Sequence, residues 1–543
     1  MKKLVSLVLA LAMVLSMTSA LATATEAMGG LEANWWVDIE IPKSELYYNE
    51  MTITTLGDHY NQYSTTFDGG FYFPTIEKMT GVHFDCDWRA DYTSTNVATA
   101  LAQGVDALPH MIRAAGDYSI PALMNEGAIV ELTPYLDLMP NVVAAVGEDR
   151  MAIWAQADGG IWSLPDLVNV PGSQSTAVRK DWLDKLGLAV PTNWEEWKTY
   201  WYAVRDNDVN GNGDAADEIP LVLEMGANGD YSLHALLNAF GIAASGNDQF
   251  CILPDGTYGM VYDHPNYKTF LEEVRTLYAD GILDQEFATR KLADVYNTMS
   301  GNLAGTVFTW AEQCAVHSET LQANGVEDGL YLTCAPIVGP FGDSMLQKRE
   351  GLTKKWCITV KAENEGLVEE ICKFWNWQFG PEGTTLYNYG IEGYTYDVVD
   401  GKKILKPEIV AAGFNTYRTI DLEFAPFGGN WLNDSFLQCV FSGLTEADLT
   451  VPRKSFYDGL REDGVNAGKY YQMPATQETD AYNDYVGELI RGGAGICTYR
   501  DQCIAGQISI DDFFARYEEL KGRGLQDVID EGNDAYQAIV GGK

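Results

Sequence analysis

The chain has 543 residues, 46% of them hydrophobic, which is more than one ordinary hydrophobic core needs and favours two domains or lobes. Its 77 acidic and 36 basic residues give a formal net charge of −41. A field of that sign disfavours nucleic acid, anionic lipid and acidic polymers as partners, and leaves uncharged ligands as the easier case.

The N-terminal segment has the pattern of a secretory signal peptide. Two lysines precede an apolar stretch at 4–17 that is too short to span a membrane, and Ala-x-Ala sites follow. We expect residues 1–24 to be removed by cleavage after Ala22 or Ala24. Because no cysteine occurs between the apolar stretch and Cys86, no lipidation site is expected. The predicted location is the periplasm or the cell surface, without a lipid anchor.

Short apolar strands alternate with helical patterns in the first part of the chain. Strands are predicted at 51–56, 82–88 and 110–114, and helices at 71–80, 92–102 and 120–125. Strands separated by helices are typical of βαβ units. The sequence therefore predicts an α/β fold with a largely parallel sheet.

A tryptophan-rich helix is predicted at 194–205. Thr192 and Glu195 have the spacing of a capping box, and Trp194, Trp197 and Trp201 recur on one helical face. We interpret these three rings as core residues.

An oxygen-rich loop, residues 206–218, follows that helix. Carboxylate and amide oxygens alternate with glycines, and a hard cation such as calcium needs six to eight oxygen ligands. The predicted ligands are the side chains of Asp208, Asn210 and Asn212, the carbonyl of Asp214, and Asp217 or Glu218. The register is not that of an EF-hand, and a solvated turn of Asx and Gly residues is the alternative. The expected role of Ca²⁺ is structural.

Catalytic signatures are missing from the sequence. It has no GxSxG element, P-loop, dinucleotide fingerprint, CxxC or HExxH, and its six histidines are scattered. Nine cysteines cannot all pair within one chain, and Cys497 with Cys503 could close a small loop.

Residues 179–188 read RKDWLDKLGL, and residues 158–165 read DGGIWSLP. Both motifs resemble segments of the extracellular solute-binding proteins of family 1, which are the capture subunits of ABC importers. His110 stands where the family usually has Asp. Further similar segments lie at 73–82, 102–110, 126–135, 305–310, 379–383 and 387–396. The NGNG and DEIP pairs in residues 210–220 resemble the branch with a calcium loop, to which alginate-binding importer subunits belong, although some members have a loop one residue shorter.

The resemblance implies a periplasmic-binding-protein-like fold of type II. Such a fold has two α/β lobes, several hinge crossings and a ligand cleft between the lobes that closes by hinge motion. The implied first lobe comprises residues 50–165 and 306–355. The second comprises 166–305 and 356–543 and carries the calcium loop.

A carbohydrate ligand would be held by aromatic rings against its C–H faces and by hydrogen bonds to its hydroxyls. Trp162 follows a Gly-Gly turn, Trp310 ends a predicted strand, and Trp431 and Tyr394 lie in glycine-rich loops. These four, with Glu312 and the weaker candidates Tyr60, Asp117 and Asn430, are the predicted ligand-binding residues. For each aromatic residue, ordinary packing is the alternative.

The sequence therefore predicts a non-enzymatic, monomeric carrier of a carbohydrate, most simply an oligosaccharide, that delivers its cargo to ABC permease subunits. A secreted glycoside hydrolase is the main alternative. It would need two carboxylates across a cleft, and the sequence marks no such pair. A calcium-dependent adhesion protein is a further alternative, but no repeats or cell-wall signals are present.

Overall fold

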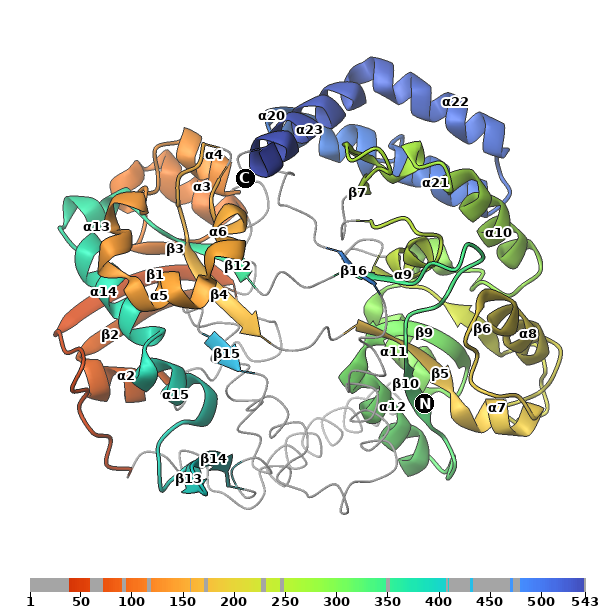
Figure 1. Ribbon diagram of the computed structural model, residues 1–543, viewed down its shortest axis with the longest axis horizontal. Coiled ribbons are helices and arrows are strands. Elements are labelled where there is room, and N and C mark those ends of the chain that lie inside the picture. The colour runs from red at the N-terminus through yellow and green to blue at the C-terminus, as the bar shows by residue number, and fades with distance from the viewer. Residues whose placement is uncertain are drawn as a thin grey trace, which may run out of the picture. The chain divides into compact units, whose positions relative to one another are not determined.

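The computed structural model describes residues 39–58, 72–89, 94–114, 119–156, 158–169, 174–225, 231–244, 249–347, 352–406, 409, 430–432, 469–471 and 479–541. The chain forms two compact units (Figure 1). The first unit comprises Met1–Val170 and Gly351–Ala447, and the second comprises Pro171–Glu350 and Asp448–Lys543.

A six-stranded sheet forms the centre of the first unit. Its order is β15-β4-β12-β3-β1-β2, and only β12 runs antiparallel to its neighbours. The strands are β1 (Met51–Asp58), β2 (Val82–Arg89), β3 (Met111–Arg113), β4 (Leu164–Asn169), β12 (Leu352–Ile358) and β15 (Asn430–Leu432). The carboxyl ends of the five parallel strands therefore lie at one edge, where ligands bind in open α/β sheets.

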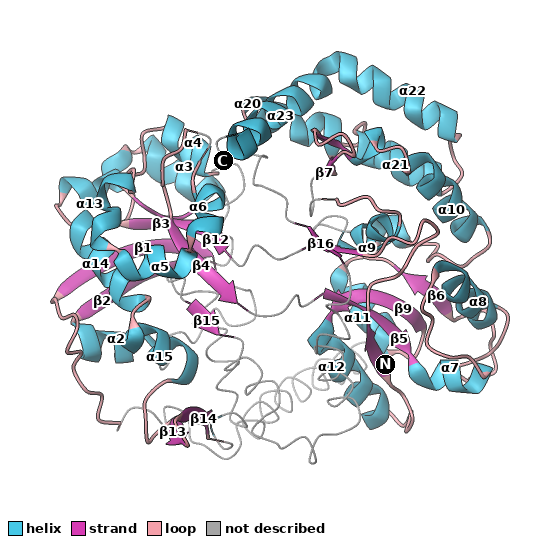
Figure 2. Ribbon diagram, in the orientation of Figure 1, coloured by secondary structure: helices cyan, strands magenta, loops and turns pink. Residues whose placement is uncertain are grey.

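Helices surround this sheet, as the cyan ribbons of Figure 2 show. They are α2 (Tyr72–Thr80), α3 (Ser94–Ala102), α4 (Ile120–Asn125), α5 (Pro140–Val146), α6 (Glu148–Trp154), α13 (Val360–Asn364), α14 (Val368–Gln378) and α15 (Pro381–Tyr389), followed by the hairpin β13 (Tyr396–Val399) and β14 (Lys402–Leu405). Ile53 of β1, Ile76 of α2 and Trp375 of α14 are fully buried in one apolar cluster. The predicted strands and helices of residues 51–125 are confirmed, with ends shifted by up to two residues.

The second unit has a four-stranded sheet of order β10-β5-β9-β6. Its strands are β5 (Gln174–Arg179), β6 (Ile219–Val222), β9 (Ala304–Trp310) and β10 (Tyr331–Cys334). β6 is parallel to β9, whereas β5 is antiparallel to both of its neighbours, β9 and β10. The carboxyl ends of β6, β9 and β10 thus share one edge with the amino end of β5.

Helices from two stretches of the chain complete this unit. The first set is α7 (Lys180–Leu186), α8 (Trp194–Arg205), α9 (Tyr231–Ala239), α10 (Tyr267–Ala279), α11 (Leu292–Ser300) and α12 (Ala311–Ala323). The second is α20 (Asp480–Tyr485), α21 (Ile496–Ile504), α22 (Ile510–Leu520) and α23 (Gln526–Gly541). Short strand pairs join β7 (Phe250–Ile252) to β8 (Tyr258–Met260), and β11 (Met345–Gln347) to β16 (Lys469–Tyr471). None of the described helices is long and apolar enough to cross a lipid bilayer.

The tryptophan-rich helix has its predicted bounds, and Trp194, Trp197 and Trp201 are 0–2% exposed, which confirms them as core residues. Its predicted cap is wrong by one residue. Asn193, not Thr192, is the N-cap, and its Oδ1 accepts from the backbone N of Glu196 at 3.2 Å. Glu196, not Glu195, reaches back, and its Oε2 accepts from the Thr192 backbone N and hydroxyl, each at 2.8 Å. Both pairs have capping spacing, so the sequence alone did not separate them.

The structure corrects the predicted lobe boundaries. The stretch at 306–355 is expected in the first lobe, but β9 pairs with β5 and β6 in the second unit. The stretch that follows residue 355 is expected in the second lobe, but β12 pairs with β3 and β4 in the first. Sheet membership is set by pairing between strands far apart in the chain, which local sequence patterns do not specify.

The cysteine loop suggested by spacing is not formed. Cys497 and Cys503 both lie on α21, and no disulfide joins them. A helix places residues six apart on different faces, which keeps their sulfurs from meeting.

A buried histidine predicts acid sensitivity. His317 on α12 is 7% exposed, its Nδ1 lies 2.8 Å from Ser300 Oγ, and burial lowers its pKa from 6.5 to about 4. Because the unfolded chain takes up a proton at higher pH than the folded chain, the free energy of unfolding should fall as pH drops from 6.5 to about 4. Urea unfolding should show that the free energy of unfolding depends less steeply on pH in His317→Asn, because asparagine cannot be protonated. An equal slope in the variant would contradict the assignment.

Candidate ligand and cation sites

Trp310 lies at the carboxyl end of β9, at the edge of the four-stranded sheet. The other residues of β9 are buried, whereas Trp310 is partly exposed. Gly305 lets β9 approach β6 closely, because a Cβ there would lie 2.9 Å from the Pro220 carbonyl oxygen. The central part of the strand is thereby fixed, and its last residue presents an aromatic ring at the edge where ligands of α/β proteins bind.

The amino end of β5 lies beside Trp310. Gln174 pairs with Trp310 in the antiparallel register, and residues 170–173 connect β4 of the first unit to β5. Trp310 therefore lies next to the place where the chain enters the second unit.

The Trp162 side chain is held by a hydrogen bond and by packing within the first unit. Its Nε1 donates to Asp158 Oδ2 at 3.0 Å, and Asp158 Oδ1 accepts from the backbone N of Gly160 at 2.8 Å. A Cβ at Gly160 would lie 2.6 Å from that Nε1, so the indole lies against the glycine. The ring is half-buried and packs on the cluster around Leu56 and Ile112.

Tyr394 is the most exposed of the described aromatic candidates. Its ring is 42% exposed, in the turn between α15 and β13. Gly393 has φ +79°, a conformation that favours glycine, and its backbone N donates to the Tyr396 carbonyl at 2.8 Å. This turn holds the ring at the surface of the first unit.

The side chains of five further candidates lie outside the described part of the chain. Trp431 and Asn430 lie in β15, where Trp431 is opposite Val168 of β4, and Glu312 lies in the first turn of α12; the side chains of these three fall outside the described part. Tyr60 and Asp117 lie outside the described residues.

The oxygen-rich loop at 206–218 curls around the carboxylate of Asp208. Its Oδ1 accepts from the backbone N of Gly211 at 2.8 Å and of Asn212 at 3.1 Å, and its Oδ2 accepts from that of Gly213 at 2.9 Å. Gly211 and Gly213 have φ +78° and +94°, so this tight loop requires both glycines.

The other predicted ligands face one another across the loop. Asn210 Nδ2 donates to Asp217 Oδ1 at 2.9 Å, and Asn212 Nδ2 donates to Asp217 Oδ2 at 2.5 Å. The Oδ1 atoms of Asn210 and Asn212 accept from the backbone N of Asn212 and Asp214, at 2.9 and 2.8 Å. Asp214 Oδ1 accepts from the backbone N of Ala216 at 3.1 Å. The loop thus gathers five oxygen-bearing residues.

Glu218 supplies the observation that points to a cation. It is 8% exposed, its Oε1 accepts from the Asn210 backbone N at 3.0 Å, and its buried Oε2 has no hydrogen-bond partner among the described residues. Burial, and then the charges of Asp217 and Asp208, raise the pKa of Glu218. A buried carboxylate oxygen beside other carboxylates fits a site for a hard cation.

Carboxylates alone do not form such a site. Within the described ranges, no three Asp, Glu, His or Cys side chains are grouped so that they could hold a metal ion. Any cation here would depend on the amide oxygens of Asn210 and Asn212 and on a carbonyl.

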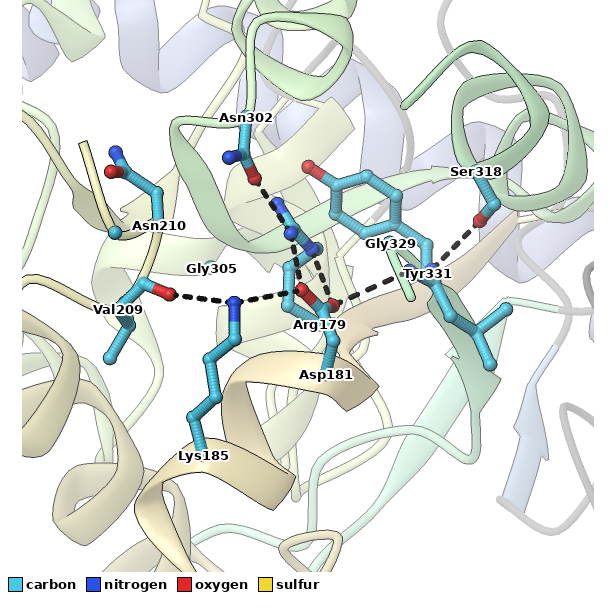
Figure 3. Close-up of polar contacts among 12 residues, drawn as sticks. Arg179, Asp181, Lys185, Val209, Asn210, Asn302, Gly305, Ser318, Gly329 and Tyr331 are labelled. Atoms are coloured by element: carbon cyan, nitrogen blue, oxygen red, sulfur yellow. Dashed lines mark hydrogen bonds and ion pairs between the residues drawn. The ribbon is translucent and has the colours of Figure 1, made fainter. Parts of the chain in front are cut away.

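An ionic network that is buried at Arg179 and Asp181 connects this loop to the sheet through the exposed Lys185 (Figure 3). Arg179 of β5 donates through Nε and Nη2 to the two carboxylate oxygens of Asp181, at 2.9 and 2.6 Å, and through Nη2 to Asn302 Oδ1 at 2.7 Å. Lys185 of α7 lies 4.0 Å from Asp181 Oδ2 and donates to the Val209 carbonyl at 3.1 Å. The loop is therefore joined to the end of β5 through one lysine.

No protein-family model matches the chain. Among curated proteins, the fructooligosaccharide ABC transporter substrate-binding protein FusA of Streptococcus pneumoniae is 26% identical over 334 residues, and the match spans 59% of each chain. Lipoprotein LipO of Bacillus subtilis is 22% identical over 484 residues, 85% of this chain and 88% of LipO. The match to FusA therefore covers less than two thirds of that relative.

The chain is a homologue of FusA, an ABC transporter substrate-binding protein, and of lipoprotein LipO. Solved structures agree in fold. The alginate-binding protein AlgQ2 without calcium ion has a TM-score of 0.69 at 20% identity, covering 91% of this chain and all of AlgQ2. FusA in complex with kestose has a TM-score of 0.65 at 21% identity over 91% of this chain and all of FusA. The predicted periplasmic-binding-protein-like α/β fold is confirmed.

Sequence reasoning missed two features of this homologue. One is the link from Lys185 to the loop, since an i, i+4 pair with Asp181 on α7 looks like a surface ion pair. The other is Glu224, a carboxylate directly after the apolar run of 221–223, where a charge at a strand end is the available signal.

Proposed function

We propose that this protein is the exported substrate-binding component of an ABC importer, a non-enzymatic monomer that binds an oligosaccharide and passes it unaltered to permease subunits. Its homology to FusA and LipO and its fold support this proposal. The predicted signal peptide at 1–24 supports export.

Trp310 is the observation within the molecule that best supports a carbohydrate ligand. A partly exposed indole at the carboxyl edge of a sheet offers an apolar face to sugar C–H groups. We propose that Trp162, Tyr394 and Trp431 also contact carbohydrate, with Glu312, Asn430, Tyr60 and Asp117 as polar or edge contacts.

Trp310→Ala should raise the dissociation constant for a bound oligosaccharide by about 10- to 100-fold, the usual loss for a central aromatic anchor. The dissociation constant is measured by isothermal titration calorimetry. The ligand is the oligosaccharide that most raises the melting temperature of the wild type. Trp310→Phe keeps a ring and should lose less. Equal affinity in wild type and Trp310→Ala would contradict this role.

We further propose that the loop at 206–218 binds Ca²⁺ through Asp208, Asn210, Asn212, Asp214, Asp217 and Glu218. The ion would neutralise the carboxylates that the loop brings together, and would fasten α8 to β6. The partnerless Oε2 of Glu218 supports this proposal. Relatives also point to it, since one FusA structure is of an EF-hand mutant.

Glu218→Gln should change stability in opposite directions with and without calcium. With chelator, the variant should melt higher than the wild type, because a buried carboxylate with a raised pKa is removed. The wild type should likewise gain stability as pH falls through that pKa, since the folded state then binds the proton more tightly. With calcium, the variant should melt lower. Melting curves that are unchanged by chelator would contradict the metal site.

A further inference from the structure

Glu224 is a buried carboxylate without a partner among the described residues. It lies two positions after β6 and is 7% exposed. Its backbone N donates a hydrogen bond to Ser232 Oγ at 2.9 Å, but this bond does not involve the carboxylate. No described side chain or amide donates to its carboxylate. Burial raises the pKa of Glu224, and no neighbouring charge contributes.

Two other buried carboxylates of this unit, Asp181 and Asp284, are paired with arginines. Asp181 is held by Arg179 at 2.6 and 2.9 Å, and Asp284 accepts from Arg290 Nη2 at 2.9 Å. A carboxylate that loses water without gaining donors is costly, which is why such groups are normally paired. The carboxylate of Glu224, by contrast, receives no hydrogen bond from the described residues.

The position of Glu224 points to where those donors come from. β6 and β9 are parallel, so Glu224 beyond the end of β6 lies at the same sheet edge as Trp310 at the end of β9. Arg290 is close to this position, but its positive charge does not compensate the carboxylate of Glu224. The carbonyl of Arg290 accepts from the backbone N of Met225 at 3.3 Å, but the Arg290 guanidinium is engaged by Asp284 and Glu286.

We propose that Glu224 is a ligand contact that selects uncharged oligosaccharides: its carboxylate accepts hydrogen bonds from sugar hydroxyls and repels ligands that carry carboxylates. This inference rests on the proposed function. Hydroxyls supply the missing donors, and a hydrogen bond to a charged acceptor is stronger than one to a neutral acceptor. An acidic sugar at the same edge would instead place two anions beside each other, which is unfavourable. The overall charge of −41 acts in the same direction.

The test is Glu224→Gln with the mature, calcium-loaded chain, titrated with kestose, maltotriose and xylotriose as neutral probes and an alginate trisaccharide as the acidic probe. Glu272→Gln is the control, because Glu272 is an exposed residue of α10 and its substitution changes the net charge equally away from the sheet edge. We expect Glu224→Gln to weaken neutral binding by roughly 10- to 100-fold. Glu224→Gln should also reduce the difference in affinity between the neutral probes and the acidic probe. Glu272→Gln should change neither the neutral affinity nor this difference.

The outcomes separate this inference from the proposed function. Saturable neutral binding that Glu224→Gln leaves unchanged, with its melting temperature intact, would overturn the role of Glu224 but not the carrier. Tighter binding of the alginate trisaccharide than of every neutral probe by the wild type would also overturn it. Failure of the wild type to bind any probe would instead count against the carbohydrate ligand itself. If Glu224→Gln melts lower, Glu224→Asp keeps the charge, and rescue of neutral binding by that variant supports the proposal.

Discussion

Asp208→Ala is expected to lower the free energy of unfolding by about 2 kcal/mol even without calcium, and by more in its presence. The carboxylate accepts three backbone N–H groups, from Gly211, Asn212 and Gly213, and a net contribution of about 0.5–1.5 kcal/mol each is usual. Without it, two residues with positive φ lose the acceptor that holds them. Urea unfolding with calcium and with chelator measures both parts.

Asp206→Ala is the matched control for that variant. Asp206 lies two residues earlier, is exposed, and pairs with Arg205 at 2.7 Å rather than with the loop amides. It should change neither stability nor the response to calcium appreciably. If Asp208→Ala still gained melting temperature from calcium as the wild type does, the proposed ligand set would be wrong.

Asp181→Ala should have the larger effect, a loss of about 3–5 kcal/mol. Arg179 and Asp181 are 0% and 3% exposed, and removing one partner of a buried pair leaves the other charge without compensation. Arg179 also lies over the rings of Trp182 and Tyr331, 4.4 and 5.3 Å from their centroids, so it has no route to water. The same variant frees Lys185, and should therefore also weaken the response to calcium.

Two variants test whether burial is the cause. Asp184→Ala on the same helix removes a carboxylate that is 63% exposed and pairs with Lys180, and should cost under about 1 kcal/mol. The double variant Arg179→Met, Asp181→Leu should recover much of the stability lost by Asp181→Ala, because two apolar groups replace an ion pair. A double variant as unstable as Asp181→Ala would contradict the electrostatic explanation.

Local patterns predicted the elements of this fold well. Trp194, Trp197 and Trp201 share one helical face, and that periodicity identified both the helix and its buried side. The order of strands and helices in residues 51–125 likewise predicted a parallel sheet, and the family motifs placed it in a known fold.

Long-range pairing is what the sequence could not supply. Whether β9 adds to one sheet or the other depends on β5 and β6, which begin about 130 and 85 residues earlier. The candidate site shows the same limit. Trp310 could be identified as a strand end, but the absence of a donor for Glu224 emerges only from the packing of its neighbours.

Titration of the calcium-loaded mature chain with an oligosaccharide panel, followed by chromatography of the recovered ligand, tests the central claim most directly. We predict saturable binding of at least one neutral oligosaccharide, which is recovered at its original length after long incubation. Shorter sugars in the recovered fraction would indicate a glycoside hydrolase, and no binding across the panel would contradict a carbohydrate carrier.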